Sequence, residues 1–519
     1  MENDFKEEIE QLEVQHEQAT HKRGLSSYIV WVNLWSTLGA WTYGYSISII
    51  SSSLAQPTFI SYFDEADTRN VAGIIGAVAS LFNVGGFIGF FVFSWLADKY
   101  GRKSAFLGAA ICSIIGQALS GGAASNWGML IFARFMTGFG GWPSAMAAVI
   151  YQSEISITET RGFLSGTVGW MIAVAYAVSA WVGVGVYYGT ANTVWRIPLL
   201  IGIIFPVLTI VFLPMVPESP RWLASKGRYE EAMEILKKMH ASSSDPHHLY
   251  ARQDYEQIHA QAELDKKLDG SWKALFTKPG YLKRVLMVIL ASTTMQCSGI
   301  QAITNFGPTL YAGLGYGPAD QLLFSAGWIT IAPIESLIMM FIVDRFGRKI
   351  MITLAPLFSA LALIIEAVLV KEFANSDNQA GKGAAVAFIF IFIAGYLFTE
   401  VATYVFIGEI FPTHLRAKGV TVALATIAAN AVWVAEGTPT GIAQLGWKFN
   451  FVYAGLSVGC CALCAYFIPE TKMIPLEEIA AIFGEDDEIA VHESDHRLTR
   501  EVTGETSNTS IDASLTKMA

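Results

Sequence analysis

The chain has 519 residues, of which 53% are hydrophobic and only 15% are charged, against roughly 25% charged residues in a soluble domain. This composition excludes an ordinary soluble globular protein. The net charge of −10 at pH 7 also argues against a nucleic-acid partner, so we read the chain for segments that cross a lipid bilayer.

Twelve predominantly apolar segments are long enough to span the hydrocarbon core of a bilayer, which needs about 20 helical residues. They cover residues 28–50, 71–97, 104–122, 128–151, 163–187, 196–216, 285–311, 319–343, 349–370, 385–409, 415–439 and 447–468. Six precede the polar stretch 217–284 and six follow it. The sequence therefore predicts an all-α membrane protein with twelve transmembrane helices in two six-helix halves.

The same pattern divides the chain into five parts. We expect an N-terminal tail at 1–27, a six-helix bundle at 28–216, a central loop at 217–284, a second bundle at 285–468 and a C-terminal tail at 469–519, mostly disordered after 485. Within the central loop, residues 228–240 place apolar side chains on one face and charged ones on the other, which predicts an amphipathic helix, and Asp254 to Leu268 reads similarly.

Basic residues predict the orientation. If the N-terminus is cytoplasmic, 28 of the 34 Lys and Arg residues lie on the cytoplasmic side, so we expect both termini to be inside. The expected location is the plasma membrane, although the sequence contains no signal that specifies it.

Three charged motifs occur twice, in the same order and at similar offsets. The pairs are DKYGRK (98–103) with DRFGRK (344–349), Glu154 and Arg161 with Glu409 and Arg416, and PESPR (217–221) with PETK (469–472). Motifs repeated in order indicate a duplicated unit of about 250 residues. A duplicated hydrophobic unit is the architecture of secondary transporters, with the substrate site between the halves.

Each DxxGRK turn has a predicted physical role. We expect Asp98 and Asp344 to accept backbone N–H groups at the positive N-terminus of the helix that follows. Glycine permits the tight turn, and Arg102 and Arg348 should reach the level of Glu154 and Glu409.

Enzyme motifs are absent from the sequence. It contains no Walker A loop, nucleophile elbow or HExxH helix, and all five cysteines lie in apolar segments without His or carboxylate neighbours. We therefore predict neither an enzyme nor a cofactor or metal site.

Together these motifs resemble the sugar porter family of the major facilitator superfamily over residues 28–485. The matching elements are DKYGRK (98–103), RFMTGFGGW (134–142), EISITETRG (154–162), PESPRWL (217–223), DRFGRK (344–349), EIFPTHLRAKG (409–419) and PETKMIPLEE (469–478). The segment after PESPRWL looks like the fungal lactose-permease-like branch, close to the hexose transporters.

The resemblance implies an inner gate in the outward-facing state, in which the charged motifs hold the cytoplasmic side closed. Its members would be Asp98, Arg102, Glu154, Arg161, Asp344, Arg348, Glu409 and Arg416. The alternative is that these charges only fix the topology.

The chain departs from the family in the expected cavity. The family's GYD triplet, whose Asp carries the proton, reads Gly44-Tyr45-Ser46, and serine does not titrate near neutral pH. Arg134, the usual partner of that Asp, is present, whereas Gly169 and Met295 stand where the family has Gln.

Carboxylates appear instead in later helices. Glu335 and Glu400 each lie nine residues before a cytoplasmic motif, about 13 Å along a helix. Since ionisable groups in membrane helices usually have a function, we predict that Glu400, and less surely Glu335, carries the proton or binds a polar substrate group. A structural hydrogen-bonding role is the alternative, and Glu366 is expected to reach an interface.

Amide and aromatic side chains suit a sugar, whose hydroxyls need donors and acceptors and whose ring faces stack on aromatic rings. The predicted substrate-binding residues are Gln296, Gln301, Asn305, Tyr404, Asn430, Trp433 and Trp170.

Three functions remain open on this reading. The leading one is a carrier of a sugar, such as a mono- or disaccharide, or a related polyol by alternating access, with or without protons. The second is a carrier or exporter of a non-sugar metabolite, suggested by Ser46, Gly169 and Met295. The third is a transporter-like sugar sensor, which the short C-terminal tail disfavours.

Overall fold

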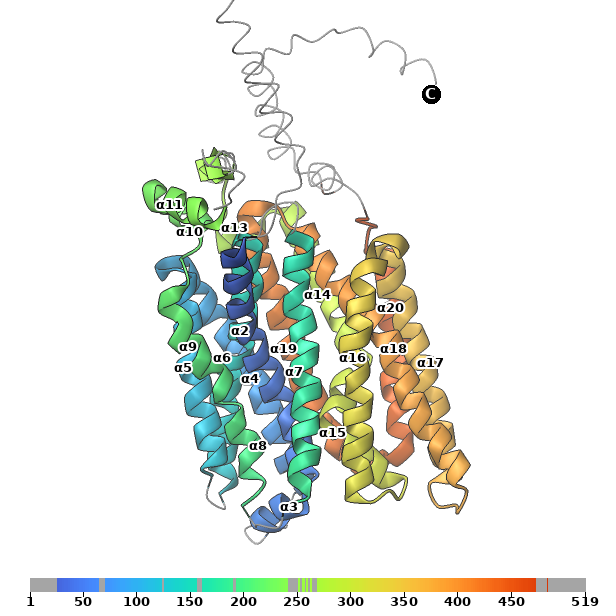
Figure 1. Ribbon diagram of the computed structural model, residues 1–519. Coiled ribbons are helices and arrows are strands. Elements are labelled where there is room, and N and C mark those ends of the chain that lie inside the picture. The colour runs from blue at the N-terminus through green and yellow to red at the C-terminus, as the bar shows by residue number, and fades with distance from the viewer. Residues whose placement is uncertain are drawn as a thin grey trace, which may run out of the picture. The chain divides into compact units, whose positions relative to one another are not determined.

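The computed structural model describes residues 26–64, 71–123, 126–155, 161–189, 193–240, 251–252, 254–256, 258–259, 262–263, 268–472 and 483. The regular elements in these residues are helices (Figure 1). They fall into two compact units, residues 1–68 with 84–262 and residues 69–83 with 263–519. The two tails predicted from the sequence lie almost entirely outside the described residues.

The membrane-crossing passes of the N-terminal half begin with α2. They are α2 (Ser27–Leu54), α4 (Val71–Tyr100), α5 (Arg102–Gly121), α6 (Trp127–Ile155), α7 (Arg161–Tyr187) and a sixth pass made of α8 (Arg196–Ile201), α9 (Ile204–Phe212) and the 3-10 turn η1 (Leu213–Met215). The short helix α3 (Pro57–Asp64) connects α2 to α4. Residues 69–83, which include the start of α4, group with the second unit.

The C-terminal half repeats the count. Its passes are α14 (Pro279–Cys297) with α15 (Ile300–Gly313), then α16 (Pro318–Phe346), α17 (Arg348–Phe373), α18 (Gln379–Ile410), α19 (Thr413–Leu445) and α20 (Asn450–Phe467), with the 3-10 turn η2 (Gly446–Phe449) before the last. Six passes on each side of the central loop confirm the predicted twelve-helix fold.

Hydropathy alone finds fewer of these passes. Among the described residues, nine helical stretches are long and apolar enough to cross a membrane, and one of them, His414–Phe467, contains both α19 and α20. The two helices outside this set are α2, which is rich in Ser, Thr and Tyr, and α6, which carries Arg134. Polar residues inside a membrane helix usually face its neighbours rather than lipid, and both helices are mostly buried.

Glycines allow the helices of the first unit to pack closely. A Cβ at Gly116 of α5 would collide with the backbone N of Thr137 in α6, and one at Gly140 would collide with the carbonyl oxygen of Ala109. Small residues at such crossings bring helix backbones into van der Waals contact, the main source of cohesion between helices in a bilayer.

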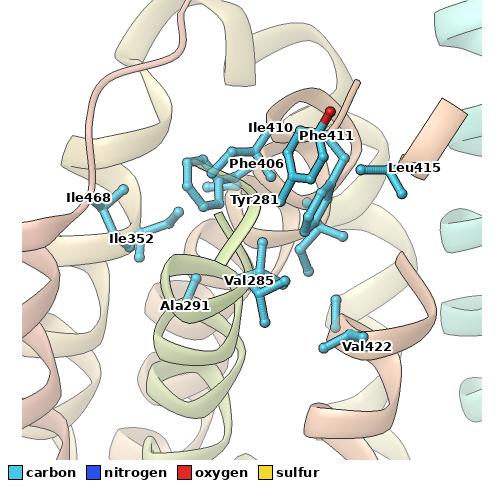
Figure 2. Packing of buried hydrophobic residues seen from close by; sticks show 14 of the residues in the cluster. Tyr281, Val285, Ala291, Ile352, Phe406, Ile410, Phe411, Leu415, Val422 and Ile468 are labelled. Atoms are coloured by element: carbon cyan, nitrogen blue, oxygen red, sulfur yellow. The ribbon is translucent and has the colours of Figure 1, made fainter. Parts of the chain in front are cut away.

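In the second unit, the start of α14 packs against the α18–α19 junction (Figure 2). Tyr281 and Val285 of α14 share one apolar cluster with Phe406 and Ile410 of α18. The buried Arg284 adds a polar anchor, since its Nη1 donates to the carbonyl oxygen of Ile410 at 2.5 Å. This contact fixes the level of α14 relative to α18.

Among its described residues, the central loop contains the short helices α10 (Pro220–Ser225), α11 (Tyr229–Met239) and α13 (Trp272–Thr277). The amphipathic helix predicted at 228–240 is confirmed by α11, which buries Ala232, Leu236 and Met239 and exposes its acidic and basic residues. Met239 joins the core of the first unit, so α11 covers that unit as part of it. The similar helix predicted at 254–268 lies largely outside the described residues.

Candidate functional site

One end of the first unit carries a buried charge cluster around Arg102, the first residue of α5. Its Nη2 and Nε lie 2.6 and 2.9 Å from the two carboxylate oxygens of Glu154, in the last turn of α6. Nη1 binds Asp98 at 3.0 Å, one turn back at the end of α4. A bidentate Arg–carboxylate pair is among the stronger polar contacts in proteins, so this cluster ties three helices together. We call the end that carries it the charged end.

The carboxylate that caps α5 is Glu218, which corrects the prediction made for Asp98. Glu218 accepts the backbone N–H groups of Arg102 and Lys103 at 2.9 and 3.2 Å, and Asp98 accepts the Arg102 guanidinium instead. The reason is geometric. Asp98 lies inside α4, and Gly101 turns the chain with φ of 104° before α5 begins, whereas Glu218 approaches from beyond the helix end.

Gly101 also makes room for this cap, because an added Cβ would collide with the Glu218 carboxylate. Burial raises the pKa of the Glu218 carboxyl above its usual value, although three backbone N–H groups, from Arg102, Lys103 and Ser219, favour the charged form. The PESP segment thus supplies the negative charge that completes the turn.

The second unit repeats this arrangement with its own residues. Arg348 pairs with Glu409 at 2.8 Å, and Glu470 accepts the N–H groups of Arg348 and Lys349 at 2.9 and 3.2 Å. These two N–H distances equal those in the first unit. Gly347 has φ of 87°, and a Cβ there would lie 2.7 Å from a Glu470 oxygen.

The other residues predicted for the charged end are placed less fully. The side chains of Arg161 and Asp344 lie outside the described set, and Arg416 is half-buried in the first turn of α19. The capping role of Glu218 and Glu470 was not predicted, although the repeated PES and PET motifs pointed to both positions.

In the first unit, Arg134 is fully enclosed between helices. It is 2% exposed, and its Nη1 donates to the backbone carbonyl oxygen of Ser46 at 2.8 Å. Ser46 directs its own hydroxyl to the carbonyl oxygen of Thr42 at 2.6 Å. Arg134 therefore contacts residue 46, where the resembled family has its Asp. The contact is to the backbone carbonyl of Ser46 and not to its side chain.

In the second unit, the seventh pass is broken at the predicted amides. α14 ends at Cys297 and α15 begins at Ile300, because Gly299 takes a left-handed conformation with φ of 87°. A Cβ at Gly299 would lie 2.8 Å from the Tyr453 ring of α20. Only glycine therefore fits this break without strain.

Three buried amides flank the break. Gln296, Gln301 and Asn305 are 3%, 7% and 2% exposed. Each leaves one polar atom without a hydrogen-bond partner among the described residues, namely Gln296 Oε1, Gln301 Nε2 and Asn305 Oδ1. An unpaired buried polar group costs about 1–3 kcal/mol, so three of them around one helix break make this region the candidate substrate site.

The structure brings one further predicted residue to this region. Asn430 of α19 donates to Thr293 Oγ1 of α14 at 3.1 Å and accepts from Trp433 Nε1 at 3.1 Å. The Trp433 and Tyr404 side chains are 41% and 40% exposed, so each presents a ring face outside the helix packing. Trp170 lies in α7 of the first unit, where it is half-buried.

The carboxylates within the membrane passes differ in their surroundings. Glu335 of α16 and Glu400 of α18 are partly exposed, and neither has a hydrogen bond or ion pair to another described residue. Glu366 is 2% exposed and accepts from the Asn450 amide of α20, so it joins two helices. Sequence reasoning missed Glu436 of α19, which accepts from Ser80 Oγ at 2.9 Å; it falls within the predicted segment 415–439, where its charge was the available signal.

Twelve membrane passes with the same charged turn in each half define a membrane transporter of the major facilitator fold. The chain belongs to the family described as sugar (and other) transporter, whose model matches residues 32–483.

Curated relatives cover most of the chain at modest identity. The MFS-type transporter criB of Aspergillus cristatus is 25% identical over 88% of this chain and 93% of that protein. The low-affinity glucose transporter HXT3 of Saccharomyces cerevisiae is 26% identical over 86% of this chain and 80% of that protein. The arabinose-proton symporter of Bacillus subtilis is 26% identical over 88% of this chain and 95% of that protein.

Solved structures agree with the fold. The proton:xylose symporter XylE, bound to 6-bromo-6-deoxy-D-glucose, aligns with a TM-score of 0.74 at 22% identity, covering 89% of this chain and 100% of that chain. XylE from E. coli in a partially occluded inward-open conformation aligns at 0.73 and 20% identity, covering 87% and 100%. At these identities the likeness establishes the fold alone.

Proposed function

We propose that this chain carries a sugar or related polyhydroxy solute across a membrane by alternating access, as a carrier and not as an enzyme. The observation that carries the proposal is the set of three unpaired amide atoms at the α14–α15 break. A packed helix interface would satisfy these groups. A binding site leaves them available.

The chemistry of the amides fits a sugar. Gln301 offers a donor, while Gln296 and Asn305 offer acceptors, so the set complements hydroxyl groups that both donate and accept. Trp433, Tyr404 and Trp170 supply aromatic faces for the apolar side of a sugar ring. The named substrates of the relatives, glucose and arabinose, support the same class.

The charge clusters are proposed to form the inner gate. Arg102 joins the ends of α4, α5 and α6, and Arg348 joins α17 to α18. In each unit a glutamate from the end of the same half caps the helix that the arginine begins. Breaking such clusters costs free energy that contacts in the other conformation must recover, so they bias the two-state equilibrium of the carrier. Arg161, Asp344 and Arg416 would complete this gate.

Coupling to a proton gradient is proposed for Glu400, with Glu335 as a second candidate. Ser46 cannot carry a proton, and Arg134 contacts the Ser46 backbone, so the first unit offers no carboxylate at that position. Glu400 and Glu335 have no protein partner within the described residues, as expected of groups that bind and release a cation. Glu366 is less suited to the coupling role, because its carboxylate already accepts a hydrogen bond from the Asn450 amide.

We further propose that both termini are cytoplasmic, that the protein resides in the plasma membrane, and that the bundles extend over 28–216 and 285–468. The excess of Lys and Arg on one side of the predicted topology supports the orientation, and the apolar segments support the bounds of the bundles.

A second candidate is a carrier or exporter of a non-sugar metabolite. It is favoured by Ser46, Gly169 and Met295, which depart from the resembled family, and by the relative criB, whose name specifies no sugar.

An uptake panel in proteoliposomes tests the proposal. The purified chain is reconstituted and offered labelled mono- and disaccharides, with and without an imposed proton gradient. Saturable uptake of at least one sugar, lost in Asn305→Ala, is the expected result. No uptake or counterflow of any sugar by protein that remains folded would reject it in favour of the second candidate.

A further inference from the structure

Three buried hydroxyls of the second unit lack hydrogen-bond partners. Ser292 of α14 and Thr399 and Thr403 of α18 are each 0% exposed. None of their Oγ atoms has a partner among the described residues.

Other hydroxyls in the membrane passes of the second unit behave differently. Thr294, Thr421 and Thr426 each donate to the carbonyl oxygen one turn earlier in their own helix, at 2.8 Å. That back-bond is the ordinary way for a membrane helix to satisfy a hydroxyl group. Ser292, Thr399 and Thr403 do not make it, so their oxygens remain available to something else.

The helix register puts the three hydroxyls on one level. Tyr281 of α14 and Ile410 of α18 lie in the same cluster (Figure 2). From there α14 and α18 run antiparallel, and Ser292 lies eleven residues beyond Tyr281, as Thr399 lies eleven before Ile410. Both positions are therefore about 16 Å along their helices from the level of Tyr281 and Ile410, and Thr403 is one turn nearer to that level.

Two more oxygen groups border this level. Gln296 lies one turn beyond Ser292 on α14, and its Oε1 is unpaired. Glu400 lies three residues before Thr403, so the two side chains are neighbours on the surface of α18. The half-helix α14 also ends here, at Cys297, which directs the negative end of its dipole to the same place.

We propose that Ser292, Thr399, Thr403, Gln296 and Glu400 form a sodium-binding site, and that Na⁺ can serve as the coupling ion of the carrier. The unpaired protein groups at this level are all oxygens, the ligands that hard cations prefer. A carboxyl group in a low-dielectric setting is either protonated or paired with a cation, and the oxygen ligands around Glu400 favour the cation. Discontinuous membrane helices hold Na⁺ in this way in other transporters.

The coupling role of Na⁺ rests on the proposed carrier function, but the binding site does not. Binding of the ion can be measured without transport. Radioactive sodium (²²Na⁺) is titrated onto the purified full chain in detergent, with no sugar and no proton gradient. Saturable binding of one ion per chain is expected. Thr403→Val and Ser292→Ala should each weaken that affinity about tenfold, and Thr421→Val, which removes a back-bonded hydroxyl, should leave it unchanged.

Two results would overturn the site. One is absence of saturable ²²Na⁺ binding by folded wild-type protein at physiological sodium concentrations. The other is equal binding by Thr403→Val, Ser292→Ala and the Thr421→Val control. If either result is found while sugar uptake persists with choline in place of Na⁺, the proposed carrier function is unaffected. If Na⁺ binds but no sugar is taken up, the sodium site is upheld and the sugar-carrier proposal is rejected.

Discussion

The charged end and the α14–α15 break treat their polar groups in opposite ways. At the charged end of the first unit Arg102 has carboxylate partners, as Arg348 has in the second unit, and the two units repeat the same cap distances. At the break, amide atoms are buried and unpaired, and the arrangement is described in the second unit only. Arg102 is thus held by two carboxylates of its own unit, whereas the three amides at the break each keep one polar atom without a partner among the described residues.

This comparison is tested most severely by removing an arginine. Arg102→Met leaves Glu154 buried without a counter-charge and should destabilise the protein by about 3–5 kcal/mol. The two side chains are only 10% and 13% exposed, so solvent screens them little. Arg348→Met should cost less, because the Glu409 side chain is 33% exposed.

Unfolding by denaturant in detergent, followed by tryptophan fluorescence, measures both variants. If Arg348→Met were the more damaging of the two, burial would not be what sets the strength of these pairs.

At the break, removing a polar group should have the opposite effect on stability. Gln301→Leu eliminates an unpaired buried amide, so the folded protein should be as stable as the wild type or more so. The KM for sugar uptake should nevertheless rise about 3- to 10-fold, the equivalent of one lost hydrogen bond.

Gln321→Leu is the matched control, because that amide donates to the Tyr316 carbonyl oxygen at 2.7 Å. It should lose stability and keep its KM. A Gln301 variant that is destabilised with unchanged KM would place this amide among the structural groups.

The partly exposed Glu400 and the buried Glu366 extend the same comparison. Glu400→Gln should abolish the stimulation of uptake by an imposed cation gradient, proton or sodium, while facilitated uptake continues. Glu366→Gln should keep the stimulation, because its partner Asn450 can still donate to the amide oxygen. Unchanged coupling in Glu400→Gln would exclude this residue as the coupling group.

The smallest effect concerns Glu218. Burial raises its pKa in the folded state, so the folded form holds its proton more tightly than the unfolded form. The stabilising contribution of the protonated group is complete below the unfolded pKa and is lost as pH rises through the folded pKa.

Glu218→Gln should therefore flatten the stability–pH curve in that acidic window. The exposed Glu234→Gln should not alter the curve. Parallel curves for wild type and Glu218→Gln in thermal unfolding would show that this carboxyl does not titrate on folding.

Much of this architecture could be predicted from local patterns. Apolar segment length gave the twelve passes, including α2 and α6, and repeated motifs gave the Arg102–Glu154 and Arg348–Glu409 pairs. The caps could not be assigned in the same way. Asp98 and Glu218 are both acidic residues near a turn, and only the path of the chain decides which one faces the helix end.

The surroundings of the polar groups inside the membrane passes were also hard to predict from sequence. Glu366, Glu400 and Glu436 look alike in sequence, as single carboxylates in apolar helices. Their different surroundings depend on tertiary neighbours, Asn450 for one and Ser80 for another. The unpaired hydroxyls of Ser292, Thr399 and Thr403 were equally hidden, because a threonine that bonds its own helix and one that does not have the same sequence pattern.

The helix caps formed by Glu218 and Glu470 also determine when, during synthesis, each half can complete its structure. The N–H groups of Arg102 and Lys103 receive their carboxylate from Glu218, which is synthesised more than a hundred residues later, and Glu470 stands in the same relation to Arg348. Each half therefore leaves the ribosome with one helix end open and closes it with its final residues. A chain that stops short of either glutamate leaves two backbone N–H groups at a helix start without their carboxylate.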